Sequence, residues 1–174
     1  EGVLGKTDFV QAVWETVDLA AQGWEGVFDL TFASMCPGIS SVDALLAFCR
    51  ASRKSCFLTT FARRRDVVRE HLGRLFFGET YQAPWGKTLS YAVATLFAAG
   101  YYPEVTYCQE SWQWAMPLDE AVRTYMPFFK DACSSQDELL SQLHVSLAAL
   151  SQDGKIEERS ESLIARLYWR VDEK

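Results

Sequence analysis

The sequence lacks the signals of several large protein classes. No apolar run approaches the ~20 residues that span a membrane, and no signal peptide is visible. There are only two histidines, and neither has a partner at metal-ligand spacing, so we expect no metal site. Basic charge is scarce too: the formal net charge is -6, which argues against general nucleic-acid binding. The basic run Arg63–Arg65 is expected to be a solvated helix start.

Signals of disulfide bonding are also missing. The five cysteines are odd in number, and no two of them have CxxC spacing. Three of them lie in apolar runs, where a free thiol behaves as a small hydrophobic group. This usage favours a reducing, cytoplasmic location. The chain starts with Glu1 instead of Met, so we expect the natural start to lie further upstream.

What the sequence does contain is enough apolar material for a folded core. Of its 174 residues, 49% are hydrophobic and 14% are aromatic, which is typical of a globular protein. No internal repeat, low-complexity stretch or linker is visible. We therefore expect residues 1–174 to form a single domain.

Hydrophobic patterning predicts strands that alternate with helices, and hence a largely parallel sheet with helices on its faces. Strands are expected at Phe9–Leu19, where a short strand runs into a turn, and at Phe28–Ala33, Ser55–Phe61, Glu104–Trp114 and Ser162–Arg170. Helices are expected after Ser40, from Val67, over Lys87–Ala99, after Pro117 up to Pro127, and after Ser135. Residues expected on buried helix faces include Val42, Leu45, Val67, Val68, Leu72, Leu75, Leu139, Leu140 and Leu143.

These segments resemble, in order, the carboxyl-terminal half of a class I S-adenosylmethionine-dependent methyltransferase. The run FDLTFASMCPGI at residues 28–39 resembles the fourth strand of that family and the loop after it. The preceding FVQAVWETVDL resembles the segment that passes the adenine ring, and SCFLTTFARRRD resembles the fifth strand. GYYPEVTYCQESWQW with LDEAVRTY resembles the sixth strand and its helix, and LIARLYWR resembles the seventh, antiparallel strand.

The resemblance implies a Rossmann-like α/β fold. Its sheet would be mainly parallel, with helices on both faces and an antiparallel last strand, and it would be truncated at its amino-terminal side. The implied activity is methyl transfer from S-adenosylmethionine to an unidentified acceptor, as part of a longer chain. Two alternatives stay open: a non-catalytic interaction or regulatory module built on half of this fold, and a doubly wound domain with an unrelated ligand.

Some parts of the family's cofactor site are missing from this sequence. The glycine-rich loop and the acidic residue that grips the ribose would lie upstream of Glu1. Val13 stands where the family usually has an acidic residue for the adenine amino group, so adenine recognition would depend on backbone amides and on packing against Trp14. We therefore expect this chain alone to bind the cofactor weakly or not at all. Without the family's first strand beside Phe28–Ala33, amides and apolar surface would be exposed, and we expect the isolated chain to self-associate.

Methyl transfer from a sulfonium needs positioning more than a fixed set of catalytic groups, and we assign no catalytic residue. Ligands of open α/β sheets bind beyond the carboxyl ends of the strands, which points to the segment from Ser34 to Pro37. The alternative is that these residues form an ordinary turn and that the tryptophans belong to a core. Our assignments are cofactor binding for Val13, Trp14, Ser34 and Met35, and acceptor binding for Cys36, Pro37 and Trp85, the last as an aromatic lid.

Overall fold

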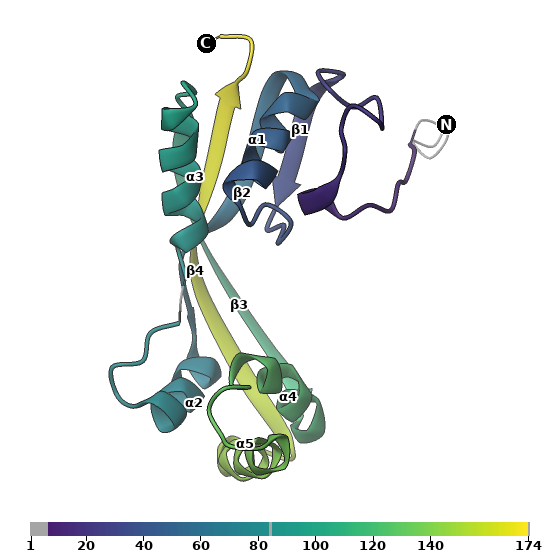
Figure 1. Ribbon diagram of the computed structural model, residues 1–174. Helices are drawn as coiled ribbons and strands as arrows, with labels where there is room; N and C mark the ends of the chain where they lie inside the picture. Colours follow the sequence, from purple (N-terminus) through teal and green to yellow (C-terminus); the bar gives the residue numbers. More distant parts are fainter. Residues whose placement is uncertain (1–6, 84, 174) are drawn as a thin grey trace, which may run out of the picture. The chain divides into compact units, whose positions relative to one another are not determined.

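A four-stranded sheet with helices is the framework of the chain (Figure 1), as seen in a computed structural model that describes residues 7–83 and 85–173. Its strands are β1 (Phe28–Ser34), β2 (Ser52–Asp66), β3 (Glu104–Pro117) and β4 (Lys155–Arg170). The α-helices are α1 (Val42–Ala51), α2 (Val67–Phe77), α3 (Lys87–Ala98), α4 (Leu118–Tyr125) and α5 (Gln136–Leu150). The predicted mixed α/β class is therefore confirmed.

The last strand of the chain lies inside the sheet, because the strand order is β1-β2-β4-β3. β1 and β2 are parallel, with Phe32 opposite Phe57. β4 is antiparallel to β2, since Val171 N donates to the carbonyl oxygen of Lys54 (2.8 Å) while the earlier Tyr168 hydroxyl meets the later Ser55 hydroxyl (3.1 Å). The arrowheads of β1 and β4 accordingly point in opposite directions in Figure 1.

The expectation of a mainly parallel sheet needs correction for these four strands. Leu118 N, just after β3, donates to the carbonyl oxygen of Gly154, just before β4, at 3.2 Å. The end of β3 thus lies beside the start of β4, and these neighbours are antiparallel as well. The parallel pair among the described neighbouring strands is β1–β2. β4 lies between β2 and β3 and runs antiparallel to both.

The described chain divides into two compact units. Unit 1 comprises residues up to Thr60, Thr88–Thr106 and residues from Ala165, and unit 2 comprises Phe61–Lys87 and Tyr107–Ile164. The single domain expected over residues 1–174 stays a prediction. None of the described helices is both long and apolar enough to cross a membrane.

Unit 1 is built where α1 packs on β1 and β2. The hydroxyl of Ser41 accepts a hydrogen bond from Ala44 N (3.1 Å), so the helix is capped one residue later than the Ser40 expected from sequence. Leu45 is fully buried, as predicted, whereas Val42 is half exposed. The reason is that Val42 is the first residue of the helix, where the chain has only begun to cover the sheet.

Unit 2 has its own core between α2, α4 and α5. Leu139, Leu143 and Leu147 recur at helical spacing along α5 and are buried together with Val68 and Leu72 of α2. Val67, Leu75 and Leu140 were also expected to face inward, but they are exposed. Each of these three lies beside the buried stripe of its helix, and only the stripe itself meets the core.

A buried carboxylate holds this core together. Glu158 on β4 is 1% exposed and accepts hydrogen bonds from Val68 N (3.1 Å), Arg159 N (2.9 Å) and the hydroxyl of Tyr125. Asp66 at the helix start makes no capping bond, so Glu158 supplies the acceptor for the first turn of α2. Burial, followed by this carboxylate, raises the pKa of Tyr125 far above its ordinary value, so the phenol stays a donor.

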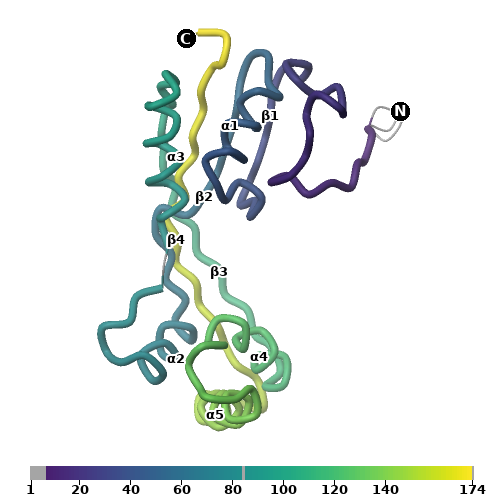
Figure 2. The backbone as a smooth tube through the Cα atoms, viewed as in Figure 1, coloured from purple at the N-terminus to yellow at the C-terminus, as the bar shows by residue number. Residues whose placement is uncertain are grey.

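The strand expected over Phe9–Leu19 is not formed. The segment is irregular, with a short 3-10 helix at Trp14–Thr16, and Figure 2 shows it as a looping trace before β1. Most of its side chains are exposed, and none of its residues belongs to the sheet. The apolar residues of this segment have no neighbouring strand to pair with, and Trp14, Val17 and Leu19 instead pack in a cluster with Ala47 and Ala51 of α1.

The outer edge of β1 has no strand partner among the described residues. Phe28, Leu30 and Phe32 alternate along the strand and are 42%, 51% and 62% exposed. Phe32 stacks on Phe57 of β2 with 5.5 Å between ring centroids, which adds to the apolar surface of this edge strand. Such an edge invites pairing with another chain.

We predict that Glu158→Gln lowers the free energy of unfolding by about 1–3 kcal/mol, because the amide has one accepting oxygen where the carboxylate has two, for three donors of which Val68 N and the Tyr125 hydroxyl are buried. Glu157→Gln, at the neighbouring exposed position, should change it by less than about 0.5 kcal/mol. Urea unfolding followed by circular dichroism measures both variants. Equal losses in the two would show that the buried carboxylate has no special part in stability.

We also predict that the isolated chain self-associates through β1 and that Phe32→Lys reduces the association. Val145→Lys on α5 is the matched control, since Val145 is 71% exposed but lies in unit 2. Light scattering over a range of concentrations gives the molar mass of each. A wild-type chain that stays monomeric at high concentration contradicts the prediction.

Candidate functional site

A hollow of about 550 Å³ lies in unit 1 beside β1. Trp14 and Trp24 come to it from the segment before β1, Cys36 and Ile39 from the connection after it, and Phe48 from α1. The walls are largely apolar and aromatic, with a few polar groups such as Thr31 and Asp8 among them. Such a lining suits a small organic molecule with a flat apolar part.

Trp14 is fixed in this wall by three contacts. Its indole Nε1 donates to the carbonyl oxygen of Ala44 in α1 at 3.0 Å. Its ring meets Phe48 edge to face, with centroids 6.3 Å apart. Gly38 approaches so closely that a side chain there would come within 3.4 Å of the Trp14 Cβ. The irregular segment before β1 is therefore held against α1 and against the turn that follows β1.

The carboxyl end of β1 is held by its parallel neighbour. The hydroxyls of Ser34 and Thr59 are 2.9 Å apart, and Met35 N donates to the carbonyl oxygen of Thr59 at 3.1 Å. Met35 has a φ of 50°, a left-handed conformation that costs a residue other than glycine about 1 kcal/mol or more. This residue turns the chain sharply from the strand toward Cys36.

The structure brings together some of the residues selected from the sequence and separates others. Trp14 and Cys36 share the hollow in unit 1. Ser34 and Met35 stand at the strand end next to it but are not part of its wall, and Val13 is 66% exposed outside it. Pro37 lies in the turn between Cys36 and Gly38, and Trp85 lies in unit 2.

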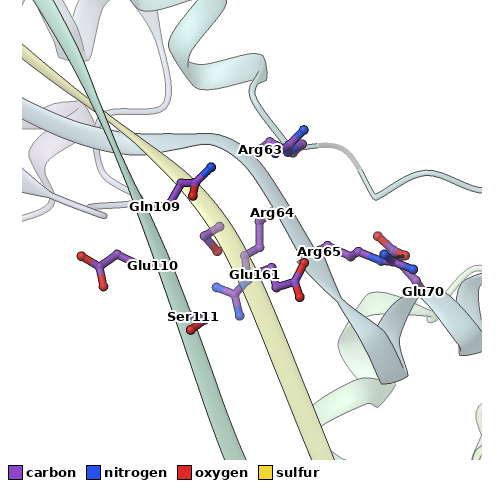
Figure 3. A pocket seen from close by; sticks show the side chains of 9 residues that line it. Arg63, Arg64, Arg65, Glu70, Gln109, Glu110, Ser111 and Glu161 are labelled. Atoms are coloured by element: carbon purple, nitrogen blue, oxygen red, sulfur yellow. Dashed lines mark hydrogen bonds and ion pairs between the residues drawn. The ribbon is translucent and has the colours of Figure 1, made fainter.

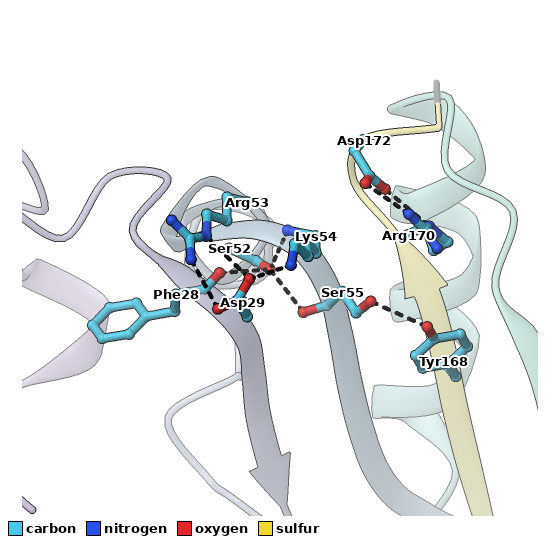
Figure 4. A network of polar contacts seen from close by, with 9 residues as sticks. All are labelled: Phe28, Asp29, Ser52, Arg53, Lys54, Ser55, Tyr168, Arg170 and Asp172. Carbon is cyan, nitrogen blue, oxygen red and sulfur yellow. Dashed lines mark hydrogen bonds and ion pairs between the residues drawn. The ribbon is translucent and has the colours of Figure 1, made fainter. Parts of the chain in front are cut away.

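Asp29 has a structural role in unit 1 that the sequence analysis did not assign. Its carboxylate accepts bonds from Arg53 Nη2 (2.9 Å) and Nε (3.1 Å), and Lys54 Nζ lies 2.8 Å away (Figure 4). Hydrogen bonds from Arg53 and then from Lys54 hold the pKa of this carboxyl well below its usual range. The group thus ties the amino ends of β1 and β2 together, close to a register shift between Phe28 and Leu30.

A second cavity, of about 630 Å³, lies in unit 2 (Figure 3). Arg63–Arg65 line it from β2, Gln109–Ser111 from β3, and Glu161 and Ser162 from β4. The basic run was expected to be a solvated helix start, but it is the end of a strand. Arg64 binds Asp66 (2.8 Å) and Arg65 binds Glu70 (3.1 Å), so these two charges are already paired.

Trp85, the expected lid, belongs to an aromatic and cationic cluster of unit 2. Its ring meets Phe61 edge to face at 5.3 Å between centroids. The guanidinium carbons of Arg64 and Arg69 lie 5.2 and 4.8 Å from the centre of the same ring. Within residues 7–83 and 85–173, no group of three or more His, Cys, Asp or Glu side chains is arranged to hold a metal ion.

Comparison with known proteins yields little. No protein-family model matches the sequence, and no curated protein matches it. One solved structure with a related chain trace is that of a proposed type II methyltransferase from Anaeromyxobacter dehalogenans. The two share 15% sequence identity at a TM-score of 0.49, and the match covers 85% of this chain and 66% of the other, just under two thirds of its length. A likeness of this size says nothing of substrate or cofactor.

We predict that Asp29→Asn destabilises the protein at pH 7 and that the difference fades in acid. The folded-state pKa is lowered, so the carboxylate contributes stability above its unfolded pKa of about 3.9, and this is lost as the pH falls below that value. Urea midpoints measured from pH 7 to pH 3 test the trend, with Asp131→Asn, an exposed aspartate of unit 2, as control. A difference that stays constant with pH would contradict it.

Proposed function

We propose that this chain is the carboxyl-terminal part of a class I S-adenosylmethionine-dependent methyltransferase domain, and that the complete domain transfers a methyl group to a small-molecule or other acceptor not yet identified. The activity belongs to the longer protein, because the glycine-rich loop and the ribose-binding acid of the family are not in this sequence.

The arrangement of the strands supports the proposal. The family that the sequence resembles has an antiparallel last strand. Here β4 is the last strand, is antiparallel to β2 and is inserted between β2 and β3. β1 and β2 then correspond to the fourth and fifth strands, and the open edge of β1 is where the family's first strand would pair.

The observation that carries the proposal is the hollow beside β1. It includes Ala33 and Cys36 at the carboxyl end of a strand with a parallel neighbour, the position at which open α/β sheets bind their ligands. Its volume of about 550 Å³ falls within the roughly 300–1,000 Å³ typical of small-molecule pockets.

The described lining fits the adenine end of the cofactor better than its charged end. Trp14 and Phe48 give the wall an aromatic lining, whereas Asp8 is the only carboxylate among the described residues of the wall. Contacts to the ribose and the methionine part would then come from upstream sequence. Ser34 and Met35, at the strand end next to the hollow, would border the adenine side, with Cys36 and Pro37 nearer the acceptor. Val13 lies outside the described wall, so its predicted contact would need the segment before β1 to move.

The role proposed for these residues is to position the cofactor and the acceptor. The bound cofactor supplies a sulfonium methyl group. The chain's own task would be to hold the adenine against Trp14, to exclude water with the apolar walls, and to keep the acceptor in line. No general base is required unless the acceptor must lose a proton early.

The test compares the 174-residue chain with a longer protein that includes the sequence encoded upstream. We expect micromolar binding of S-adenosylmethionine by the longer protein in calorimetry, and weak or no binding by the 174-residue chain. Trp14→Ala in the longer protein should weaken binding about tenfold or more, since stacking of a base on an aromatic ring contributes roughly 1–3 kcal/mol.

Trp112→Ala is the control, because Trp112 is a partly exposed tryptophan of β3 in unit 2. It should leave the affinity unchanged. Micromolar binding by the 174-residue chain alone contradicts the division of the site proposed here. An upstream reading frame without a glycine-rich strand–turn–helix segment, together with no cofactor binding, would favour a non-catalytic module instead.

A further inference from the structure

We propose that Arg69 and Trp85 form a binding site for an oxyanion group, a carboxylate or a phosphate, of a small molecule. The site lies wholly within unit 2 and does not depend on the methyl-transfer proposal.

The first observation is a buried guanidinium between two aromatic rings. Arg69 stands in the first turn of α2 and is only 8% exposed. Its guanidinium carbon lies 3.9 Å from the centre of the Phe128 ring and 4.8 Å from that of Trp85. The two rings fix the position of the charge and shield it from water.

The second observation is that this charge has no counter-ion among the described residues. The three carboxylates around the start of α2 all have other partners. Asp66 pairs with Arg64 at 2.8 Å, and Glu70 pairs with Arg65 at 3.1 Å. Glu158 is occupied by Val68 N, Arg159 N and Tyr125. A buried charge without a partner is costly, and ring faces compensate it only in part.

The third observation is a pair of unused donors. Arg69 Nε and Trp85 Nε1 are both buried and have no hydrogen-bond acceptor among the described residues. Both groups need an acceptor, and their side chains are in contact. A water molecule would satisfy the hydrogen bonds but not the charge, whereas an oxyanion satisfies both. The planar fork of arginine is suited to carboxylate and phosphate geometry.

The place of Arg69 on its helix adds a fourth, independent argument. It is the third residue of α2, at the positive end of the helix dipole, where a cation is unfavourable and an anion is stabilised. A positive side chain at this point is disfavoured both by the helix dipole and by the loss of water around the charge. A bound anion would relieve both conflicts.

The experiment titrates the 174-residue chain with two probes, benzoate and inorganic phosphate, followed by calorimetry and tryptophan fluorescence. We expect saturable binding of at least one probe in the millimolar range or tighter. Preference for benzoate would identify a carboxylate ligand and preference for phosphate a phosphorylated one. Arg69→Met should weaken binding at least tenfold. Trp85→Phe keeps an aromatic face but has no indole N–H, so it should weaken binding severalfold.

Arg166→Met is the matched control, since Arg166 is an exposed arginine of β4 in unit 1. It should bind the probes like the wild type. Without ligand, Arg69→Met should also raise the melting temperature by a few degrees, because methionine removes an unpaired buried charge; a purely structural arginine would give a fall. The proposal is overturned if neither probe binds saturably, if Arg166→Met weakens binding as much as Arg69→Met, or if Arg69→Met lowers the melting temperature.

Discussion

The parallel ladder between β1 and β2 is the interaction on which unit 1 depends. β1 has no other strand neighbour among the described residues, so this ladder and the helix above it are what hold the strand. Both ends are secured by side chains: Asp29 binds Arg53 and Lys54 at one end, and Ser34 meets Thr59 at the other. The hollow is bounded by β1, α1, the turn between them and the segment before β1, so this pairing holds one of its walls in place.

Two of the buried charged residues of unit 2, Glu158 and Arg69, have opposite surroundings. Glu158 is surrounded by three donors, among them the start of α2 and Tyr125, and so joins the helix to the strand beneath it. Arg69 is enclosed by two aromatic rings without an acceptor for its Nε. The first arrangement is what a stable core requires. The second departs from it, and in natural proteins such departures are concentrated at sites that bind something.

Local signals in the sequence were enough to place most elements. The strand at Phe28, the helix end before Pro127 and the Ser135 cap are each determined by neighbours a few residues away. The strand at Phe9–Leu19 was wrong because a strand exists only if another strand lies beside it. The candidate sites were harder to predict, since Asp29 and Arg53, like Arg69 and Phe128, meet only after the chain has folded. No local pattern predicts that β4 lies between β2 and β3 either, although the family resemblance implied that this last strand is antiparallel.

The left-handed backbone of Met35 has an evolutionary consequence. If only the sharp turn after β1 matters, glycine or asparagine would be accepted there with less strain, and descendants of this gene should drift toward them. If the thioether has a task at the mouth of the hollow, selection should retain methionine in spite of the strain. The range of residues found at this single position in related genes therefore distinguishes a backbone requirement from a side-chain requirement, without any knowledge of the ligand.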